Sequence, residues 1–279
     1  MVQEIKLEEI KEIQLTILQY IDKICKDNEI NYSLCGGAMI GAVRNNKFIP
    51  WDDDIDILLP RPFYEKLIQI LKKDHKYLLL ELRNKADYYY PFAKLVNKKT
   101  VLIENKIARI DGLGINVDIF PIDGLPEDKK SLKRHIRKLY FYNFMLRNSI
   151  PHWNKFYTFN LKELLHRIIK LPLVLISKIF GVNYWKAKLH KTMTYYKFGS
   201  TRKAGFLLSA YGEREVMDEK VFESFDNIKF ENLNFAIIQN YDIYLTSLYG
   251  NYMELPPKEQ QKTHHNFIAY WKEDYERFK

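Results

Sequence analysis

Hydrophobic and polar residues alternate with two different periods in the first sixty positions of the chain. Apolar residues three or four positions apart predict an amphipathic helix over residues 3–28. Its apolar stripe is formed by Ile10, Ile13, Ile17, Ile21 and Ile24. A short buried strand is expected over residues 31–35, followed by a helix over residues 38–44. Apolar and polar residues then alternate singly over residues 54–57, before Leu58 and Leu59, which predicts a half-buried strand over residues 54–59.

The same patterns extend through most of the remaining chain. We expect a helix over residues 62–73, and strands over residues 77–82 and 116–119. Residues 92–96 and 101–104 flank an Asn-Lys-Lys turn and predict a hairpin. A second hairpin or small meander is expected over residues 221–235, and a helix over residues 241–249 that Gly250 ends.

Residues 127–198 have a helical and strongly basic pattern with no strand signal. Within it, residues 168–180 are mostly apolar, and we expect a helix packed on the core rather than one lying at a membrane surface. The fold class is therefore α/β (α+β), a mixed sheet flanked by helices with a helical insertion in the second half. One domain over residues 1–279 is the simplest organisation, with its core at about 20–126 and 200–270 and the insertion at about 127–200.

Composition narrows the classes of partner. The chain of 279 residues has 44 basic and 35 acidic residues, a net charge of +9, which favours anionic ligands. Two cysteines, Cys25 and Cys35, are too few for a disulfide framework or a Cys-rich zinc site. The charged N-terminus does not have the pattern of a signal peptide, and no apolar run is long enough to span a membrane.

The main chemical signal is the acidic run that leads into the strand at residues 54–59. On a strand, Asp52, Asp54 and Asp56 would share one face, with Ile55 and Ile57 on the other. Carboxylates that are crowded together and partly buried need a cation to offset their charge. Oxygen-only ligation by carboxylates suits Mg²⁺ or Mn²⁺.

Two further features accompany this acidic run. Gly36 and Gly37 lie between a strand and a helix, where backbone N–H groups can approach a phosphate. Asp118 lies on the later strand, facing away from Val117 and Ile119. By contrast, Asp123 stands in a turn and is interpreted as structural.

Three kinds of site contain closely spaced aspartates. A calcium loop of EF-hand type is excluded, because its sixth and twelfth positions would be Ile57 and Phe63 instead of Gly and Glu. The Asp-x-Asp motif of metal-dependent glycosyltransferases would leave the Gly-Gly turn and Asp118 unexplained. A nucleotidyltransferase-type site contains all three parts in the observed order.

Each residue type has a role in such a site. Asp54 and Asp56 would hold metal against a diphosphate, while Asp118 would complete the metal site and could take the proton of the attacking hydroxyl. A cationic side chain would neutralise developing charge. The cationic candidates are Arg44, Arg61 and Lys94, and the sequence does not choose among them.

Three stretches resemble the LicD family. They are LCGGAMIGAVRNNKFIPWDDDIDILLPRPFYEKL, GINVDIFPIDGLP and YDIYLTSLYGNYMELPPKEQQKTHH, so the resemblance spans about residues 20–270. It implies a nucleotidyltransferase fold, with Asp54, Asp56 and Asp118 as catalytic residues, and with Asp52 as a further metal ligand beside them. It also implies a nucleotide-phosphate loop at Gly36 and Gly37, next to which we place Arg44 as a cofactor-binding residue. No role for His264 and His265 follows from the motif.

The function implied by this resemblance is transfer of a phosphorylated alcohol from a CDP-linked donor to a sugar hydroxyl of a surface glycan. Phosphocholine from CDP-choline is preferred, with a teichoic acid or lipopolysaccharide precursor as acceptor. Aromatic residues near the motifs could hold a quaternary ammonium group: Trp51, Tyr88, Tyr89, Tyr90 and Phe92. Core packing is the preferred interpretation for most of them, and without an aromatic cage a glycerol-phosphate or ribitol-phosphate donor would fit as well.

Other functions remain open at this point. One is a nucleotidyltransferase that adds NMP to a small molecule or protein, and another is a basic pseudoenzyme that binds a glycan or membrane surface. No nucleic-acid motif accompanies the positive charge, so we expect no nucleic-acid partner. We expect a cytoplasmic protein, and leave a peripheral contact with the inner face of the membrane open.

Overall fold

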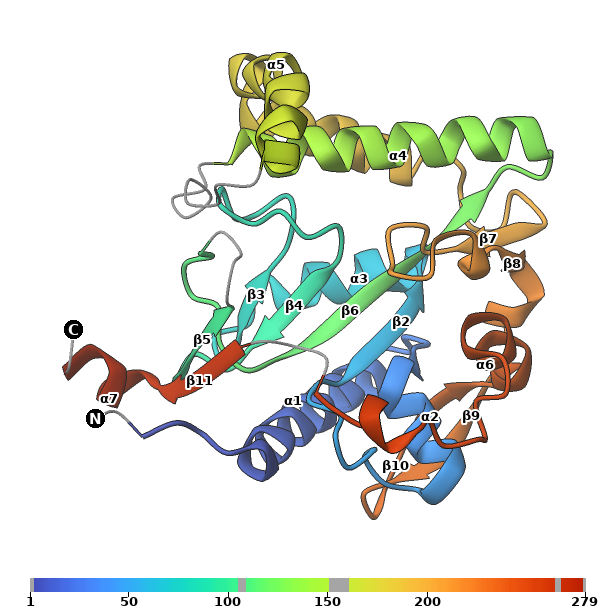
Figure 1. Cartoon of the computed structure of the whole chain (residues 1–279). Coiled ribbons are helices and arrows are strands. Elements are labelled where there is room, and N and C mark those ends of the chain that lie inside the picture. The colour runs from blue at the N-terminus through green and yellow to red at the C-terminus, as the bar shows by residue number, and fades with distance from the viewer. Residues whose placement is uncertain (1–2, 105–108, 151–160, 264–266, 278–279) are drawn as a thin grey trace.

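A mixed β-sheet forms the centre of the molecule (Figure 1). The computed structural model describes residues 3–104, 109–150, 161–263 and 267–277. The main path through the sheet follows the order β1-β2-β6-β4-β3, and β7 and β8 extend it from the end of β6. Its five strands are β1 (Ser33–Cys35), β2 (Asp56–Pro60), β6 (Asn116–Leu125), β4 (Ala93–Val96) and β3 (Leu78–Leu80). The pair β2–β6 is parallel and the other pairs are antiparallel.

Strand β2 begins two residues later than expected, at Asp56. Its pairing with β1 starts where Cys35 faces Asp56, and β1 ends at Cys35 because α2 (Gly36–Asn45) follows directly. Asp52 and Asp54 therefore precede the strand in a loop, and the prediction that they share a strand face with Asp56 was wrong.

Helix α1 (Leu7–Asp27) confirms the predicted amphipathic helix with slightly shorter bounds. Ile17 and Ile21 are fully buried, and α1 packs against β6 as does α3 (Arg61–Leu71). Burial of one such side chain stabilises the fold by roughly 1.5–3 kcal/mol. The second helix of the sequence prediction starts at Gly36 rather than at residue 38.

The hairpin predicted over residues 92–104 does not form. Strand β4 pairs with β3 and β6, whereas β5 (Thr100–Glu104) pairs with β11 (Phe267–Trp271) near the C-terminus. Figure 1 shows β5 and β11 side by side, away from the main sheet. The local pattern could not reveal a partner more than 160 positions away.

The basic middle of the chain forms two packed helices, α4 (Lys129–Ser149) and α5 (Leu161–Met193). Helix α5 continues through Pro172, and its one non-helical residue is Gly181, where the chain kinks. In contrast to the expectation of a core-packed helix, several apolar side chains between residues 171 and 180 are exposed. Figure 1 shows these helices above the sheet, as one layer at the edge of the molecule.

The last third of the chain adds smaller elements beside the sheet. They are β7 (Lys203–Gly205), β8 (Met217–Asp218), the predicted hairpin β9–β10 (Phe225–Phe230 and Leu233–Ile238), α6 (Tyr241–Tyr249), α7 (Lys272–Arg277) and three short 3-10 helices (Gly212–Glu215, Glu219–Phe222 and Lys258–Gln260). Helix α6 ends before Gly250, as predicted. No helix in the described ranges is long and apolar enough to cross a membrane.

Candidate active site

Four aspartates line one large cavity beside strands β2 and β6. Asp52, Asp54, Asp56 and Asp118 all face a cavity of about 1000 Å³, together with Gly36, Gly37 and Arg44. The cavity is bounded by the start of α2, strands β2 and β6, the segment around residues 206–215, α6 and residues 251–260. The structure thus brings every residue of the predicted site to the same cavity.

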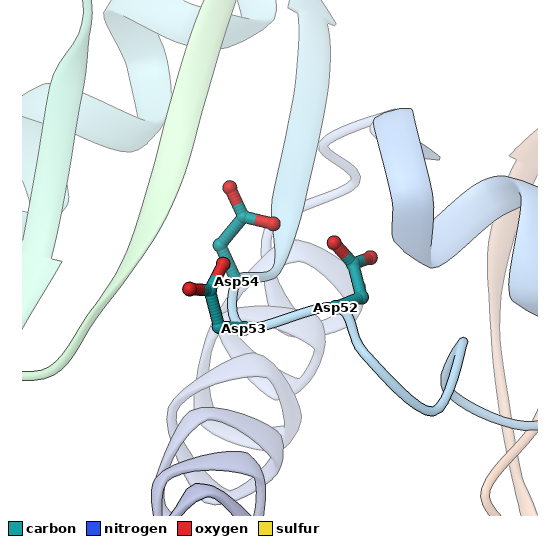
Figure 2. A group of neighbouring side chains, drawn as sticks. All are labelled: Asp52, Asp53 and Asp54. Atoms are coloured by element: carbon teal, nitrogen blue, oxygen red, sulfur yellow. The ribbon is translucent and has the colours of Figure 1, made fainter. Parts of the chain in front are cut away.

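The loop before β2 carries three consecutive aspartates (Figure 2). Carboxylate oxygens of Asp52, Asp53 and Asp54 lie within 4.8 Å of one another. Asp52 and Asp54 line the cavity, whereas Asp53 is buried at the side of it. Asp52 and Asp54 are therefore the stronger candidates for contact with a bound ion.

Helix α1 fixes the position of this acidic loop. The Nζ atom of Lys11 donates hydrogen bonds to the carbonyl oxygens of Ile49 (3.0 Å) and Pro50 (2.9 Å). The buried amide of Gln14 donates to the carbonyl oxygen of Asp53 (3.0 Å). Both residues were missed at the sequence level; the one available signal was a polar glutamine next to the apolar stripe of the helix.

Gly36 and Gly37 allow the carboxylates to approach the N-terminus of α2. A Cβ atom on Gly37 would lie 1.8 Å from Oδ2 of Asp52, and one on Gly36 would lie 2.9 Å from Oδ2 of Asp56. Gly36 also has a φ of 57°, which an L-residue rarely adopts. The sequence related these glycines to phosphate, and the structure adds that they make room for two aspartates.

Strand pairing sets the positions of Asp56 and Asp118. These residues face each other in the parallel register of β2 and β6. Asp118 accepts hydrogen bonds from Nζ of Lys94 (2.6 and 2.8 Å) and from the side-chain amide of Asn116 (2.6 Å). Lys94 is thus the cationic candidate that lies beside the aspartates.

The electrostatics of the cavity fit a divalent cation. Burial, together with neighbouring Asp54, raises the pKa of Asp52 to about 8, and burial with Asp54 raises the pKa of Asp56 well above its usual value. Oδ2 of Asp52 and Oδ1 of Asp56 are buried and accept no hydrogen bond from the described part of the chain. Clustered carboxylate oxygens of this kind are the ligands that Mg²⁺ and Mn²⁺ prefer.

The other two cationic candidates have different partners. Arg61 is largely buried and forms a two-point ion pair with Asp123 (2.7 and 2.5 Å), which supports a structural role for both residues. Arg44 lines the cavity, but its guanidinium donates to the carbonyl oxygens of Tyr252 and Glu254. Arg44 therefore ties the C-terminal segment to α2 at the cavity edge.

Aromatic residues form another wall of the cavity. The rings of Phe92 and Phe120 are 4.5 Å apart, and Phe206 lies 5.3 Å from Phe120. Trp51 also lines the cavity, but Tyr88, Tyr89 and Tyr90 do not; the ring of Tyr90 packs against Phe92 at 5.2 Å instead. The remaining large aromatic side chains of the lining are Tyr211, Tyr244, Tyr249 and Tyr252.

Glu215 is a further buried acid in this wall. It is 4% exposed, lines the cavity, and its Oε2 has no hydrogen-bond partner among the described residues. Burial raises its pKa to about 7. No sequence signal pointed to Glu215, because it stands alone in a polar stretch without a motif.

His264 and His265, the remaining residues of the resemblance, lie outside the described residues.

Comparison with known proteins agrees with this arrangement. Residues 29–164 match the LicD/FKTN/FKRP nucleotidyltransferase domain family. The matched range includes the glycine turn and all four aspartates of the cavity. The chain is 31% identical over 277 residues to the lipopolysaccharide cholinephosphotransferase LicD of Haemophilus influenzae. That alignment covers 96% of this chain and 98% of the relative. The chain therefore belongs to the LicD family and is a LicD-type transferase of phosphorus-containing groups.

Proposed function

We propose that this protein transfers phosphocholine from CDP-choline to a sugar hydroxyl of a cell-surface glycan precursor. The carrying observation is that four aspartates and a phenylalanine wall line the same cavity. Its volume of about 1000 Å³ can accommodate a nucleotide-linked donor together with part of an acceptor. The relative at 31% identity is named a lipopolysaccharide cholinephosphotransferase. We therefore take a lipopolysaccharide precursor as the first acceptor to test.

The carboxylates supply the metal-binding part of this proposal. Asp52, Asp54, Asp56 and Asp118 would hold Mg²⁺ or Mn²⁺. When bound, such an ion offsets the charge of the donor's diphosphate and stabilises the leaving oxygen. Asp118 is oriented by Lys94 and Asn116, and it is our candidate to accept the proton of the acceptor hydroxyl. The new bond joins the sugar oxygen to the choline-bearing phosphorus, and CMP leaves.

The aromatic wall supplies a reason to prefer choline over other alcohols. Phe92, Phe120 and Phe206 present three rings within 4.5–6.2 Å of one another. Aromatic faces attract a quaternary ammonium group, which glycerol and ribitol lack. The free, buried thiols of Cys25 and Cys35 suit a reducing compartment, so we place the reaction in the cytoplasm.

A transfer assay with product analysis tests this function. The purified chain with Mg²⁺, CDP-choline and a lipopolysaccharide or teichoic-acid precursor should release CMP and add phosphocholine to the glycan. We expect Asp56→Asn to lower the rate by at least about a hundredfold, and the exposed Asp226→Asn to leave it unchanged. Release of pyrophosphate from a nucleoside triphosphate, with no CMP from CDP-choline, would instead establish an NMP transferase.

The donor preference has its own test. Phe120→Leu keeps the bulk of the side chain but removes the aromatic face. If the rings hold the ammonium group, the KM for CDP-choline should rise about threefold to thirtyfold. The KM for CDP-glycerol should change much less. Equal changes for the two donors would contradict a choline subsite at this wall.

A further inference from the structure

An exposed apolar patch lies on the middle of α5, between residues 171 and 184. Ile179 is 79% exposed, Leu175 53% and Phe180 52%. The remaining members of this patch are Leu171, Leu173, Ile176 and Tyr184. Scattered exposed apolar residues are ordinary, but seven of them within fourteen consecutive positions of one helix indicate an interaction surface.

The patch adjoins the kink of α5 and is held in place there. The indole N–H of buried Trp185 donates to the carbonyl oxygen of Ser177 (2.9 Å), across the non-helical Gly181. The rings of Phe180 and Tyr184 lie 5.7 and 4.9 Å from Trp185. This hydrogen bond and these ring contacts therefore stabilise the kink that positions the exposed side chains.

A basic cleft lies next to the apolar patch, between α4 and the second half of α5. Its lining contains four cationic side chains and no acidic one: Arg134, Lys138, Lys188 and Lys191. Lys188 connects the two features, because its Nζ lies 5.3 Å from the ring centroid of Tyr184. Like charges gathered around a cleft of about 380 Å³ favour an anionic ligand.

The positive charge of the chain is concentrated on helices α4 and α5. Helices α4 and α5 together contain 14 lysine and arginine residues and one acidic residue. The whole chain has a net charge of only +9, so the rest of the molecule is acidic on balance. The positive charge is thus concentrated on the element that also exposes the apolar patch.

We infer that the α4–α5 surface, formed by this patch and this cleft, docks the protein on an anionic lipid bilayer. Aliphatic side chains would enter the boundary between headgroups and acyl chains, and the cations would contact lipid phosphates. An acidic protein partner would account for the cations, but not for leucine and isoleucine side chains interspersed with Lys170 and Lys178. This inference does not depend on the donor or the acceptor proposed above.

Vesicle binding of the full chain tests the inference. We expect the protein to sediment with vesicles of phosphatidylcholine mixed with phosphatidylglycerol, and much less with phosphatidylcholine alone. The double variant Leu175→Asn/Ile179→Asn should lower partitioning onto the mixed vesicles about tenfold or more. Its matched control is Ile243→Asn on α6, which changes a side chain of comparable exposure (54%) and should bind as the wild type does.

The cleft is tested separately by charge. Lys138→Gln/Lys188→Gln should weaken binding to the mixed vesicles about tenfold or more. Lys73→Gln/Lys229→Gln removes the same net charge from exposed positions elsewhere and should have a small effect. Far-ultraviolet circular dichroism would verify that each variant keeps its helical content.

Two results would overturn the inference. One is equal vesicle binding by the wild type and the Leu175→Asn/Ile179→Asn variant, including no binding by either. The other is a wild-type dimer in light scattering that this double variant converts to a monomer, because the patch would then be a subunit interface.

Discussion

The absence of a side chain at Gly37 makes room for the carboxylate of Asp52. A methyl group at Gly37 would occupy the space of the Asp52 carboxylate, at 1.8 Å from Oδ2. We predict that Gly37→Ala displaces Asp52 and weakens Mn²⁺ binding about tenfold or more, since a misplaced ligand loses most of its contribution. Isothermal titration with Mn²⁺ measures this effect.

A double-mutant cycle separates this clash from a general effect on the helix. In an Asp52→Ala background the space beside Gly37 is empty, so Gly37→Ala should weaken Mn²⁺ binding little further. Additive losses from the two substitutions would mean that the glycine acts independently of Asp52.

Glu215 gives the protein a specific dependence of stability on pH. Its pKa is about 7 in the folded protein against an ordinary 4.5, so the folded state retains a proton that the unfolded state releases between these values. The free energy of unfolding therefore falls as pH rises through this window. Glu215→Gln cannot ionise, and it should exceed the wild type in stability at pH 8 by about 3 kcal/mol. The two proteins should differ little at pH 4.

Urea unfolding of the metal-free protein at both pH values checks this prediction. The exposed Glu223→Gln is the control and should show no such difference between the two pH values. A Glu215→Gln variant whose stability relative to the wild type is the same at pH 4 and pH 8 would contradict the assignment.

At the residue scale, the sequence predicted the aspartates that line the cavity but not the residues around them. Asp52, Asp54, Asp56 and Asp118 form recognisable motifs, and all four line the cavity. Gln14 bonds to a loop 39 positions away, and Glu215 joins a cavity formed mostly by distant segments, and no local pattern marks either position.

At the scale of elements, the Arg61–Asp123 ion pair fastens α3 to β6. The side chains of Arg61 and Asp123 are only 11% and 7% exposed, and removal of one partner leaves the other charge without compensation. We predict that Arg61→Met lowers the free energy of unfolding by about 3–5 kcal/mol. Lys272→Met, which breaks the exposed pair with Glu276 (3.8 Å), should cost no more than about 0.5 kcal/mol.

Urea denaturation of both variants measures the comparison. If Arg61→Met is no more costly than Lys272→Met, the buried pair does not hold the helix to the sheet.

Element types were easier to predict from the sequence than element partners. Helices α1 and α6 and the β9–β10 hairpin depend on local periodicity and turn residues, and each formed where expected. The pairing of β5 with β11 depends on the folded chain as a whole and was not predictable from either segment. The exposure of α5 depends on what packs against it, which periodicity does not encode.

At the scale of the whole molecule, the cavity joins segments from most of the chain. Its lining residues lie in the segments 35–58, 118–122, 206–215 and 244–260, together with Phe92. Because the lining comes from segments far apart in the sequence, ligand binding should stabilise the entire fold rather than one loop. Removal of the metal should abolish that stabilisation, since the diphosphate would then face uncompensated carboxylates.

The measurement that tests this account most directly is thermal unfolding with CDP-choline, in Mg²⁺ and in EDTA. A ligand at 100 times its Kd stabilises the folded state by about 2.7 kcal/mol. We predict a rise in Tm with CDP-choline and Mg²⁺ that is absent in EDTA and absent in Asp56→Asn. An equal rise in EDTA, or no rise with CDP-choline under either condition, would contradict a metal-dependent CDP-alcohol site in this cavity.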